Sequence, residues 1–302
     1  MFRTLLRNKV GSDSFTMCRI WLLRMAGLLL TLLAASAYAR TPACDEVPDE
    51  REAFAEELLA SLHPYDCCDD TIANCLEQKP TCALAFRLSE DICRRVAGGQ
   101  SRDRILGAMS RRARSISTAG KKASISLLGL SVAGDRRAPI TVVEYACPRC
   151  PYCAAITPKI HDAVVTGPLQ GKVKLYFKTF PLRDHPGSKE GGLAFVAAQR
   201  LGHFWEFLSY FYQHSELFSV LGLADWAEAV GMDRRAFERA MADPESRRLL
   251  VEMKKEGIVN DVQATPTFFV NGRKYLAELT AEEVVDVLEE EFDKIEGVRY
   301  LQ

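Results

Sequence analysis

Three cysteines lie close together near the middle of this 302-residue chain, in the run CPRCPYC at residues 147–153. The run directly follows residues 140–145 (ITVVEY), an apolar segment that is typical of a buried strand. Two cysteines separated by two residues, placed between a strand and a helix, indicate a dithiol that can be oxidised and reduced. A helix that begins at Cys150 places this thiol at the helix N-terminus, where free N–H groups and the helix dipole favour the thiolate. Cys153 then lies one turn further on, near enough to close a disulfide with Cys150.

The same spacing also occurs in metal sites. Half of a zinc site is one alternative, but no second pair of suitably spaced ligands follows in this half of the chain. An iron–sulfur run requires a fourth cysteine, and Thr157 stands where that cysteine is needed. We therefore expect no bound metal and no dissociable cofactor, because the cysteines themselves carry the electrons. A copper(I) site formed by the three thiols, in a binding or chaperone module, stays open as an alternative from another functional class.

The segments around this run alternate between strand and helix patterns. The predicted elements, in chain order, are strands over 140–145 and 172–182, a helical stretch over 187–262, a hairpin over 267–279 and a closing helix over 281–295. Breaks in the helical stretch are expected near Gly202, Ser219 and Gly231. This order of elements is that of an α/β chain with a thioredoxin fold and a helical insertion.

Three segments together resemble the DsbA-like branch of the thioredoxin superfamily: residues 140–153, residues 180–182 (FPL) and residues 265–272 (TPTFFVNG). In that family a glutamate lies six residues before the nucleophilic cysteine, and Glu144 lies six residues before Cys150. The resemblance covers about residues 125–300. It implies that Cys150 and Cys153 form the redox pair, and that Cys147 lies outside it.

The resemblance also implies where a substrate binds. In the family a cis-proline loop lies against the CxxC motif, and Thr265 and Pro266 occupy that place in this sequence. We expect these two residues, with Pro151 and Tyr152 inside the CxxC motif, to bind the substrate chain. The implied activity is that of a thiol:disulfide oxidoreductase acting on protein disulfides.

Glu144 is expected to be buried, because strand alternation places it on the same face as Ile140 and Val142. A carboxylate in such surroundings is costly unless it has a partner or a task. Cys153 must lose its proton to attack a mixed disulfide, and burial raises the pKa of a thiol. We therefore predict that Glu144 accepts the Cys153 proton. The alternative is a hydrated strand end at which Glu144 is merely solvated.

Two further features near this site are interpreted as structural. His185 could be an acid–base group, but a histidine in such a loop more often fixes the loop. The aromatic row over residues 204–212 could line a peptide groove, but its helical spacing favours packing of the inserted helices.

The first half of the mature chain is rich in cysteine and has no clear strand. Helices are predicted over 50–62, 82–96 and 102–116, and we expect a small all-α domain over 40–123 before the DsbA-like domain over 124–302. Residues 68–114 faintly resemble the helical domain of CcmH-type cytochrome c maturation proteins, but lack the compact CxxC of that family. The six cysteines of this half are Cys44, Cys67, Cys68, Cys75, Cys82 and Cys93.

Structural disulfides are the expected role of these six cysteines, because a three-helix unit of this size has a thin core. Six cysteines allow 15 pairings, and the sequence leaves the choice among them open. Cys82 and Cys93 share a helix face but lie roughly 16 Å apart along the axis, so they do not pair with each other. Adjacent Cys67 and Cys68 are expected to have separate partners.

Charge is distributed unevenly, although the net charge of the whole chain is only −1. Such a balance gives no basic field for nucleic acid, and that class of partner is excluded. Residues 40–91 hold four basic and thirteen acidic side chains, whereas residues 92–122 hold nine basic and one acidic. We expect the basic helix to pack beside the acidic one and to be neutralised by it. An acidic partner or a membrane surface is the alternative.

The N-terminus indicates export. Arg19 and Arg24 precede an uncharged run over 25–39, which ends in Ala37-Tyr38-Ala39. This is the order of a secretory signal peptide over residues 1–39, and the run is shorter than the ~20 apolar residues of a membrane-spanning helix. An uncleaved anchor is the alternative. A periplasmic location follows, in an oxidising compartment.

The sequence therefore predicts an exported thiol:disulfide oxidoreductase that uses Cys150 and Cys153. Its expected partners are cysteine-containing substrate proteins and a membrane redox protein that recycles it. The direction of electron flow stays open: oxidation of substrates is the default, and a reductase or isomerase, perhaps serving cytochrome c maturation, is the alternative. Substrates, oligomeric state and the role of Cys147 are also left open by the sequence.

Overall fold

The computed structural model describes residues 40–115 and 122–301. The predicted signal peptide over 1–39 and the predicted end of the third helix at Ile116 lie outside these residues. Among the described residues, no helix combines the length and apolar character that a bilayer crossing requires.

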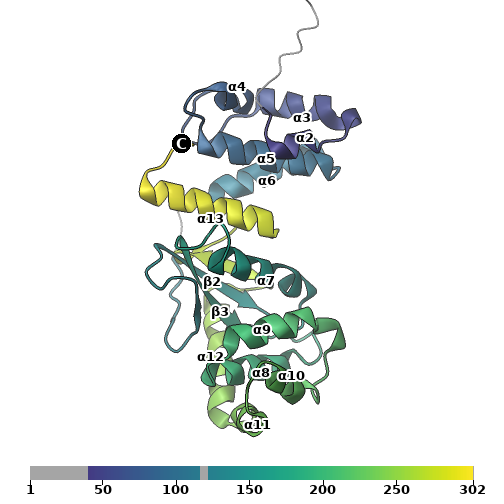
Figure 1. Ribbon diagram of the computed structural model, residues 1–302, viewed down its shortest axis with the longest axis vertical. Helices are drawn as coiled ribbons and strands as arrows, with labels where there is room; N and C mark the ends of the chain where they lie inside the picture. Colours follow the sequence, from purple (N-terminus) through teal and green to yellow (C-terminus); the bar gives the residue numbers. More distant parts are fainter. Residues whose placement is uncertain (1–39, 116–121, 302) are drawn as a thin grey trace, which may run out of the picture.

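A five-stranded sheet lies at the centre of the second half of the chain (Figure 1). Its two long strands pair in parallel, and aliphatic and aromatic residues are the majority in both of them, as is typical of buried strands. The outer strands all run antiparallel to their neighbours. In spatial order the strands are β1 (Val132–Ala133), β3 (Val173–Thr179), β2 (Ile140–Ala146), β4 (Thr267–Val270) and β5 (Arg273–Lys274).

Helices cover both faces of this sheet. α7 (Pro151–Val165) and α13 (Ala281–Glu296) lie on one face, where Val142 contributes to the core that they share with the sheet. α12 (Pro244–Val259) contributes Met253 to the core of the opposite face, together with Tyr145 from β2. Alternation along β2 therefore directs Glu144 toward α7, on the same side as Val142, as the sequence predicts.

The helical insertion lies between β3 and β4 and packs over the cysteine run. The predicted breaks near Gly202, Ser219 and Gly231 are confirmed, and one further break, which was not predicted, occurs at Asp243. The Asp243 side chain accepts a 2.9 Å hydrogen bond from the N–H of Glu245 and caps α12, so a new helix begins there. The inserted elements are α8 (Ser188–Arg200), α9 (Phe204–Gln213), a 3₁₀ turn (Ser215–Leu217), α10 (Leu223–Ala229), α11 (Arg234–Ala242) and α12.

The aromatic row of α9 packs the insertion rather than lining a groove. Phe204, Phe207, Phe211 and Tyr212 are at most 3% exposed. Phe195 of α8 makes edge-on contacts with all four rings. The structural interpretation of this row is therefore confirmed.

The cysteine-rich half is all-α, as predicted, but it contains more helices than the three that the sequence indicates. The additional helices have four and six residues, too short to show a helical period in the sequence. The helices are α2 (Pro42–Asp45), α3 (Asp49–Ser61), α4 (Ile72–Glu77), α5 (Ala83–Ala97) and α6 (Arg102–Ser115).

Three disulfides join these helices and the loops between them. They are Cys44–Cys93, Cys67–Cys82 and Cys68–Cys75. The separate partners of Cys67 and Cys68 confirm the prediction, as does the lack of a bond between Cys82 and Cys93. Cross-links of this kind stabilise small units mainly by restricting the unfolded chain.

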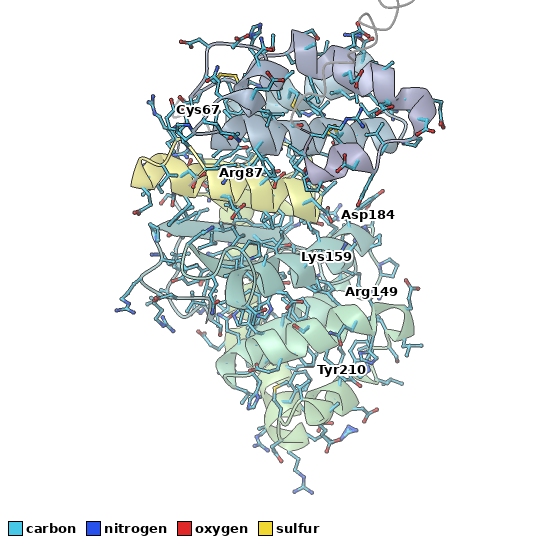
Figure 2. All side chains as sticks on the ribbon, turned by 45° about the horizontal axis from the view of Figure 1, so that its top comes forward. Cys67, Arg87, Arg149, Lys159, Asp184 and Tyr210 are labelled. Carbon is cyan, nitrogen blue, oxygen red and sulfur yellow. A yellow bond between two sulfur atoms is a disulfide. The ribbon has the colours of Figure 1, made fainter. Side chains whose placement is uncertain are left out.

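α13 lies between the sheet and the cysteine-rich half and contacts both (Figure 1). Its acidic side chains meet the basic side chains of α5 and α6, and Figure 2 labels Arg87 of α5 at this boundary. Arg87 lies 2.7 Å from Asp293 of α13. Arg112 of α6 is fully buried and pairs with Asp91 of α5 and Glu290 of α13. The predicted neutralisation therefore occurs, but α13 supplies much of the acidic charge.

The predicted second strand of the hairpin over 273–279 is wrong beyond Lys274. The N–H of Leu276 donates a 2.8 Å hydrogen bond to Ser115 Oγ of α6, and Tyr275 turns into the core. The chain therefore leaves the sheet to pack against the cysteine-rich half. β1 was also missed, because two residues are too few to show strand alternation.

Candidate active site

The site forms where β2 ends and α7 begins. Cys150 is the N-cap residue of α7, and Pro151 opens the helix, where its missing N–H costs nothing. The N–H of Cys150 donates a 3.1 Å hydrogen bond to the carbonyl of Cys147, which closes the turn that links strand and helix. Cys150 is 3% exposed, while Cys153 and Cys147 are fully buried. All three thiols are free.

The surroundings of Cys150 favour its thiolate. A hydrogen bond from the Cys153 thiol is the largest influence, and with help from the N–H groups of Cys153 and Tyr152 it lowers the pKa of Cys150 to about 5. The helix N-terminus thus acts on Cys150 as the sequence predicts. Burial acts in the opposite direction on Cys153, and raises its pKa far above the usual range of a thiol.

The loop before β4 lies directly against Cys150. The Thr265–Pro266 peptide bond is cis, and the Thr265 carbonyl oxygen lies 3.4 Å from Cys150 Sγ. Thr265, Pro266 and Tyr152 line one groove of about 570 Å³, and the Tyr152 side chain is 75% exposed at its edge. The structure therefore brings three of the four predicted substrate-binding residues together in this groove, while Pro151 is exposed at the start of α7 and is not part of its lining.

Glu144 is fully buried beneath the two thiols. Burial raises the pKa of its carboxyl to about 8, while a 2.6 Å hydrogen bond from Thr157 Oγ1 to Glu144 Oε1 partly offsets this rise. The charge of Glu144 in turn contributes to the raised pKa of Cys153. Glu144 is therefore a buried group in electrostatic contact with both cysteines, and the alternative of a solvated strand end is wrong.

From the sequence, Thr157 has no predicted role and is noted only because it cannot replace a cysteine as a metal ligand. It lies four residues after Cys153 on α7, so both side chains occupy the helix face that meets β2. This i, i+4 spacing opposite an expected buried carboxylate is the signal that could have identified it.

Two further groups border the cysteines. Tyr212 of α9 is 3% exposed, and its hydroxyl donates a 3.3 Å hydrogen bond to the carbonyl of Cys147. His185 Nδ1 lies 3.3 Å from Cys147 Sγ, so this histidine contacts the extra cysteine in addition to its place in the loop. Both residues are interpreted as structural from the sequence, which does not predict their contacts with Cys147.

Arg149, the charged residue inside the run, points away from the thiols. Its guanidinium donates a 2.7 Å hydrogen bond to the carbonyl of Ser215 and lies 4.3 Å from the centre of the Phe218 ring. It therefore fastens the turn to the helical insertion. Over residues 40–115 and 122–301, no three His, Cys, Asp or Glu side chains are grouped as metal ligands.

Known proteins resemble about half of the chain. Na⁺/H⁺ antiporter NhaA 3 of Salinispora tropica is 33% identical over 145 residues, which cover 48% of this chain and 22% of the antiporter. The chain thus spans less than a quarter of that relative's length. Oxidised BdbD of Bacillus subtilis is similar in structure with a TM-score of 0.49, 24% identity, and coverage of 57% of this chain and 97% of BdbD. For α-DsbA1 of Wolbachia pipientis the TM-score is 0.48, the identity 20%, and the coverage 56% and 94%.

A family model described as Thioredoxin matches residues 129–290, more than half of the chain. The matched segment contains the sheet, the cysteine run, the helical insertion and the cis-proline loop. The predicted family is thereby confirmed. The chain belongs to the thioredoxin family, and its helical insertion lies between β3 and β4.

Proposed function

We propose that this chain is an exported enzyme that forms disulfides in cysteine-containing substrate proteins through Cys150 and Cys153. The observation that carries the proposal is the contrast between the two thiols. Cys150 at the start of α7 has a pKa of about 5, whereas burial raises the pKa of Cys153 well above its ordinary value. Cys150 is therefore a stable thiolate at neutral pH, whereas Cys153 must take up a proton when the disulfide between them is broken.

The low pKa of Cys150 favours oxidation of substrates over their reduction. Stabilising this thiolate stabilises the reduced enzyme relative to the disulfide form, which makes the disulfide a stronger oxidant. Because the pKa of Cys150 is lowered, the stabilisation of the reduced enzyme depends on pH. It is complete above the ordinary thiol pKa of ~8.5 and is lost as the pH falls through about 5. Oxidation is therefore favoured at neutral pH.

The reaction exchanges two sulfur–sulfur bonds in turn. A substrate thiolate attacks Cys150 Sγ of the Cys150–Cys153 disulfide, a mixed disulfide forms, and Cys153 leaves as a thiolate. Glu144, protonated below its pKa of about 8, supplies the proton that Cys153 takes up. A second substrate thiolate attacks the substrate sulfur of the mixed disulfide and releases the Cys150 thiolate. The substrate loses two electrons and the enzyme gains them.

The groove beside Cys150 would hold the substrate chain during this exchange. The Thr265 and Pro266 loop lies against Cys150, Tyr152 lines the same groove, and Pro151 is exposed at the start of α7. An extended segment in this groove places its cysteine next to Cys150, and proximity of this kind accelerates the exchange.

The three disulfides of the cysteine-rich half support a periplasmic location, because such bonds persist in oxidising compartments. An enzyme that oxidises substrates there must be oxidised again after each turnover. A membrane redox protein that accepts two electrons from Cys150 and Cys153 is the proposed partner for that step.

A redox titration of Cys150 and Cys153 against glutathione tests the proposal. The expected result is a dithiol that becomes half oxidised only when glutathione disulfide is abundant, as for a strong oxidant. A dithiol that is half oxidised in mostly reduced glutathione would contradict the proposed direction and favour the reductase or isomerase alternative. Insulin reduction with dithiothreitol, together with copper analysis, tests the alternative class: inactive protein that carries stoichiometric copper would favour the binding module.

A further inference from the structure

The groove beside Cys150 does not end at the thioredoxin-like half of the chain. Glu278, in the segment between β5 and α13, lines this groove and also lines a second hollow of about 420 Å³. The other walls of the second hollow come from the cysteine-rich half: Gln100, Asp103, Arg104 and Arg111. The two hollows therefore meet at one side chain, and α6 extends the surface that a bound chain could follow.

The two arginines that line the second hollow, unlike most others nearby, form no ion pair with the described residues. Most arginines of α5 and α6 pair with acidic side chains, as Arg94 does with Asp286 and Arg102 with Glu57. The guanidinium groups of Arg104 and Arg111 are exposed and make no ion pair or hydrogen bond within the described parts of the chain.

The acidic residue at the junction cancels this charge only in part. Glu278 is paired with Arg95 of α5, which is 6% exposed and is shared with two further carboxylates, Asp91 and Glu283. Asp103 is then the one remaining acidic side chain among the residues that line the second hollow, against two arginines. The hollow therefore carries an excess of positive charge beside the substrate groove.

The two arginines are spaced for an extended chain. Arg104 and Arg111 lie seven residues apart on α6, which places them about 10 Å apart along one face of the helix. Three residues of extended polypeptide span the same distance. Gly107 lies on this face between them, and the Arg111 guanidinium extends back over it, 3.3 Å from where a Cβ of residue 107 would lie. On the wall of the first groove, exposed Lys159 of α7 (Figure 2) is balanced by exposed Glu282, so the unpaired cations of this surface are Arg104 and Arg111 of the second hollow.

We propose that the second hollow binds an acidic segment of the substrate polypeptide, while the neighbouring cysteines of the same polypeptide occupy the groove at Cys150. This inference rests on the proposed function and specifies its substrate class: proteins in which a short acidic stretch lies a few residues from the reacting cysteines. The cysteine-rich half then contributes directly to substrate selection.

The test uses oxidised full-length protein and synthetic dithiol peptides. Each peptide carries a cysteine pair and, beyond a short spacer, about four residues that are all Asp or all Asn, a length that spans both arginines. Peptides with the segment before and after the cysteines cover both chain directions. Each turnover transfers two electrons from the peptide dithiol to the Cys150–Cys153 disulfide. Acid quenching and mass spectrometry give the second-order rate constant.

The expected result is an Asp peptide that reacts about three- to tenfold faster than its Asn counterpart at low salt, since two exposed ion pairs contribute modestly. The preference should disappear near 1 M salt, where screening is strong. Arg104→Ser combined with Arg111→Ser should remove the preference. The matched control, Arg136→Ser combined with Arg235→Ser, removes the same charge from exposed sites outside the hollow and should retain it.

Equal rates for Asp and Asn peptides in both chain directions would overturn this inference and leave the proposed function intact. Loss of the preference in the control variant would also overturn it, because the effect would then come from net charge alone. Absence of exchange with every peptide would contradict the proposed function itself. If the two arginines govern binding to anionic lipid vesicles and not the peptide preference, a membrane surface is the partner and the inference is wrong.

Discussion

Thr157 Oγ1 of α7 donates a 2.6 Å hydrogen bond to Glu144 Oε1 of β2, directly beneath the cysteine pair. The second oxygen, Glu144 Oε2, is buried and has no hydrogen-bond partner among the described residues. One oxygen thus fixes the carboxyl while the other is free to exchange a proton. A buried carboxyl with a pKa of about 8 is suited to giving and taking protons near neutral pH.

Glu144→Gln keeps the shape of this side chain and removes its proton exchange. It should slow deprotonation of Cys153, measured by stopped flow as the resolution of a mixed disulfide between Cys150 and a small thiol. The wild type uses the Glu144 carboxylate as the base, and the variant depends on hydroxide. Below pH ~8 the carboxylate fraction and the hydroxide concentration fall in proportion as the pH falls, so the ratio of wild-type to variant rates should be constant there. Above pH ~8 the ratio should fall, because hydroxide keeps increasing and the carboxylate fraction does not. Superimposable rates from about pH 5 to 9 would rule out proton transfer by Glu144.

Thr157→Val should raise the pKa of Glu144 above about 8, because the hydrogen bond that favours the carboxylate is lost. In the same stopped-flow experiment, the pH at which the rate levels off should move upward. Thr157→Ser retains the hydroxyl and serves as the control that keeps the wild-type profile. If Thr157→Val changes the rates equally at every pH, Thr157 has only a packing role.

The thiolate of Cys150 should be visible in its reaction with iodoacetamide. The alkylation rate of the reduced enzyme should rise with pH around a midpoint near 5, because the thiolate is the reactive form. Peptide mapping at pH 7 should find the label on Cys150 and little on buried Cys147 or Cys153. A midpoint near 8.5, the value of an unperturbed thiol, would contradict the stabilised thiolate.

Arg112 should be important for stability rather than for exchange. Its guanidinium is fully buried and contacts Asp91, Glu290 and Asp286, so Arg112→Met leaves buried carboxylates without their cation. Breaking a buried pair on one side costs about 3–5 kcal/mol, which urea unfolding should detect. Arg235→Met, on the exposed part of α11, is the control and should change stability by less than ~0.5 kcal/mol. If Arg112→Met lowers the free energy of unfolding by less than ~1 kcal/mol, water must solvate the carboxylates of this network.

The sequence predicts those parts of the molecule whose signal is local. The strand over 140–145 and the helix start at Cys150 lie within about fifteen residues, so spacing alone relates them, whereas the Glu144 offset takes its meaning from the family resemblance. Contacts between distant segments leave no such signal. The Thr265 carbonyl at Cys150 was predicted only through the family resemblance, and the pairing of Arg112 with Glu290 spans 178 residues. The short strands and helices were missed because two to six residues do not establish a period.

The identity of the attacked sulfur is the central claim, because Cys147 also forms a CxxC spacing with Cys150. In the Cys153→Ser variant, the substrate should remain attached to the enzyme as a mixed disulfide. Proteolysis with mass spectrometry should locate this disulfide at Cys150. Cys147→Ser combined with Cys153→Ser should trap the same substrate at the same position, because Cys147 is fully buried beside His185. A substrate found on Cys147, or no trapping once Cys147 is replaced, would show that residues 147 and 150 form the active pair and would contradict the account.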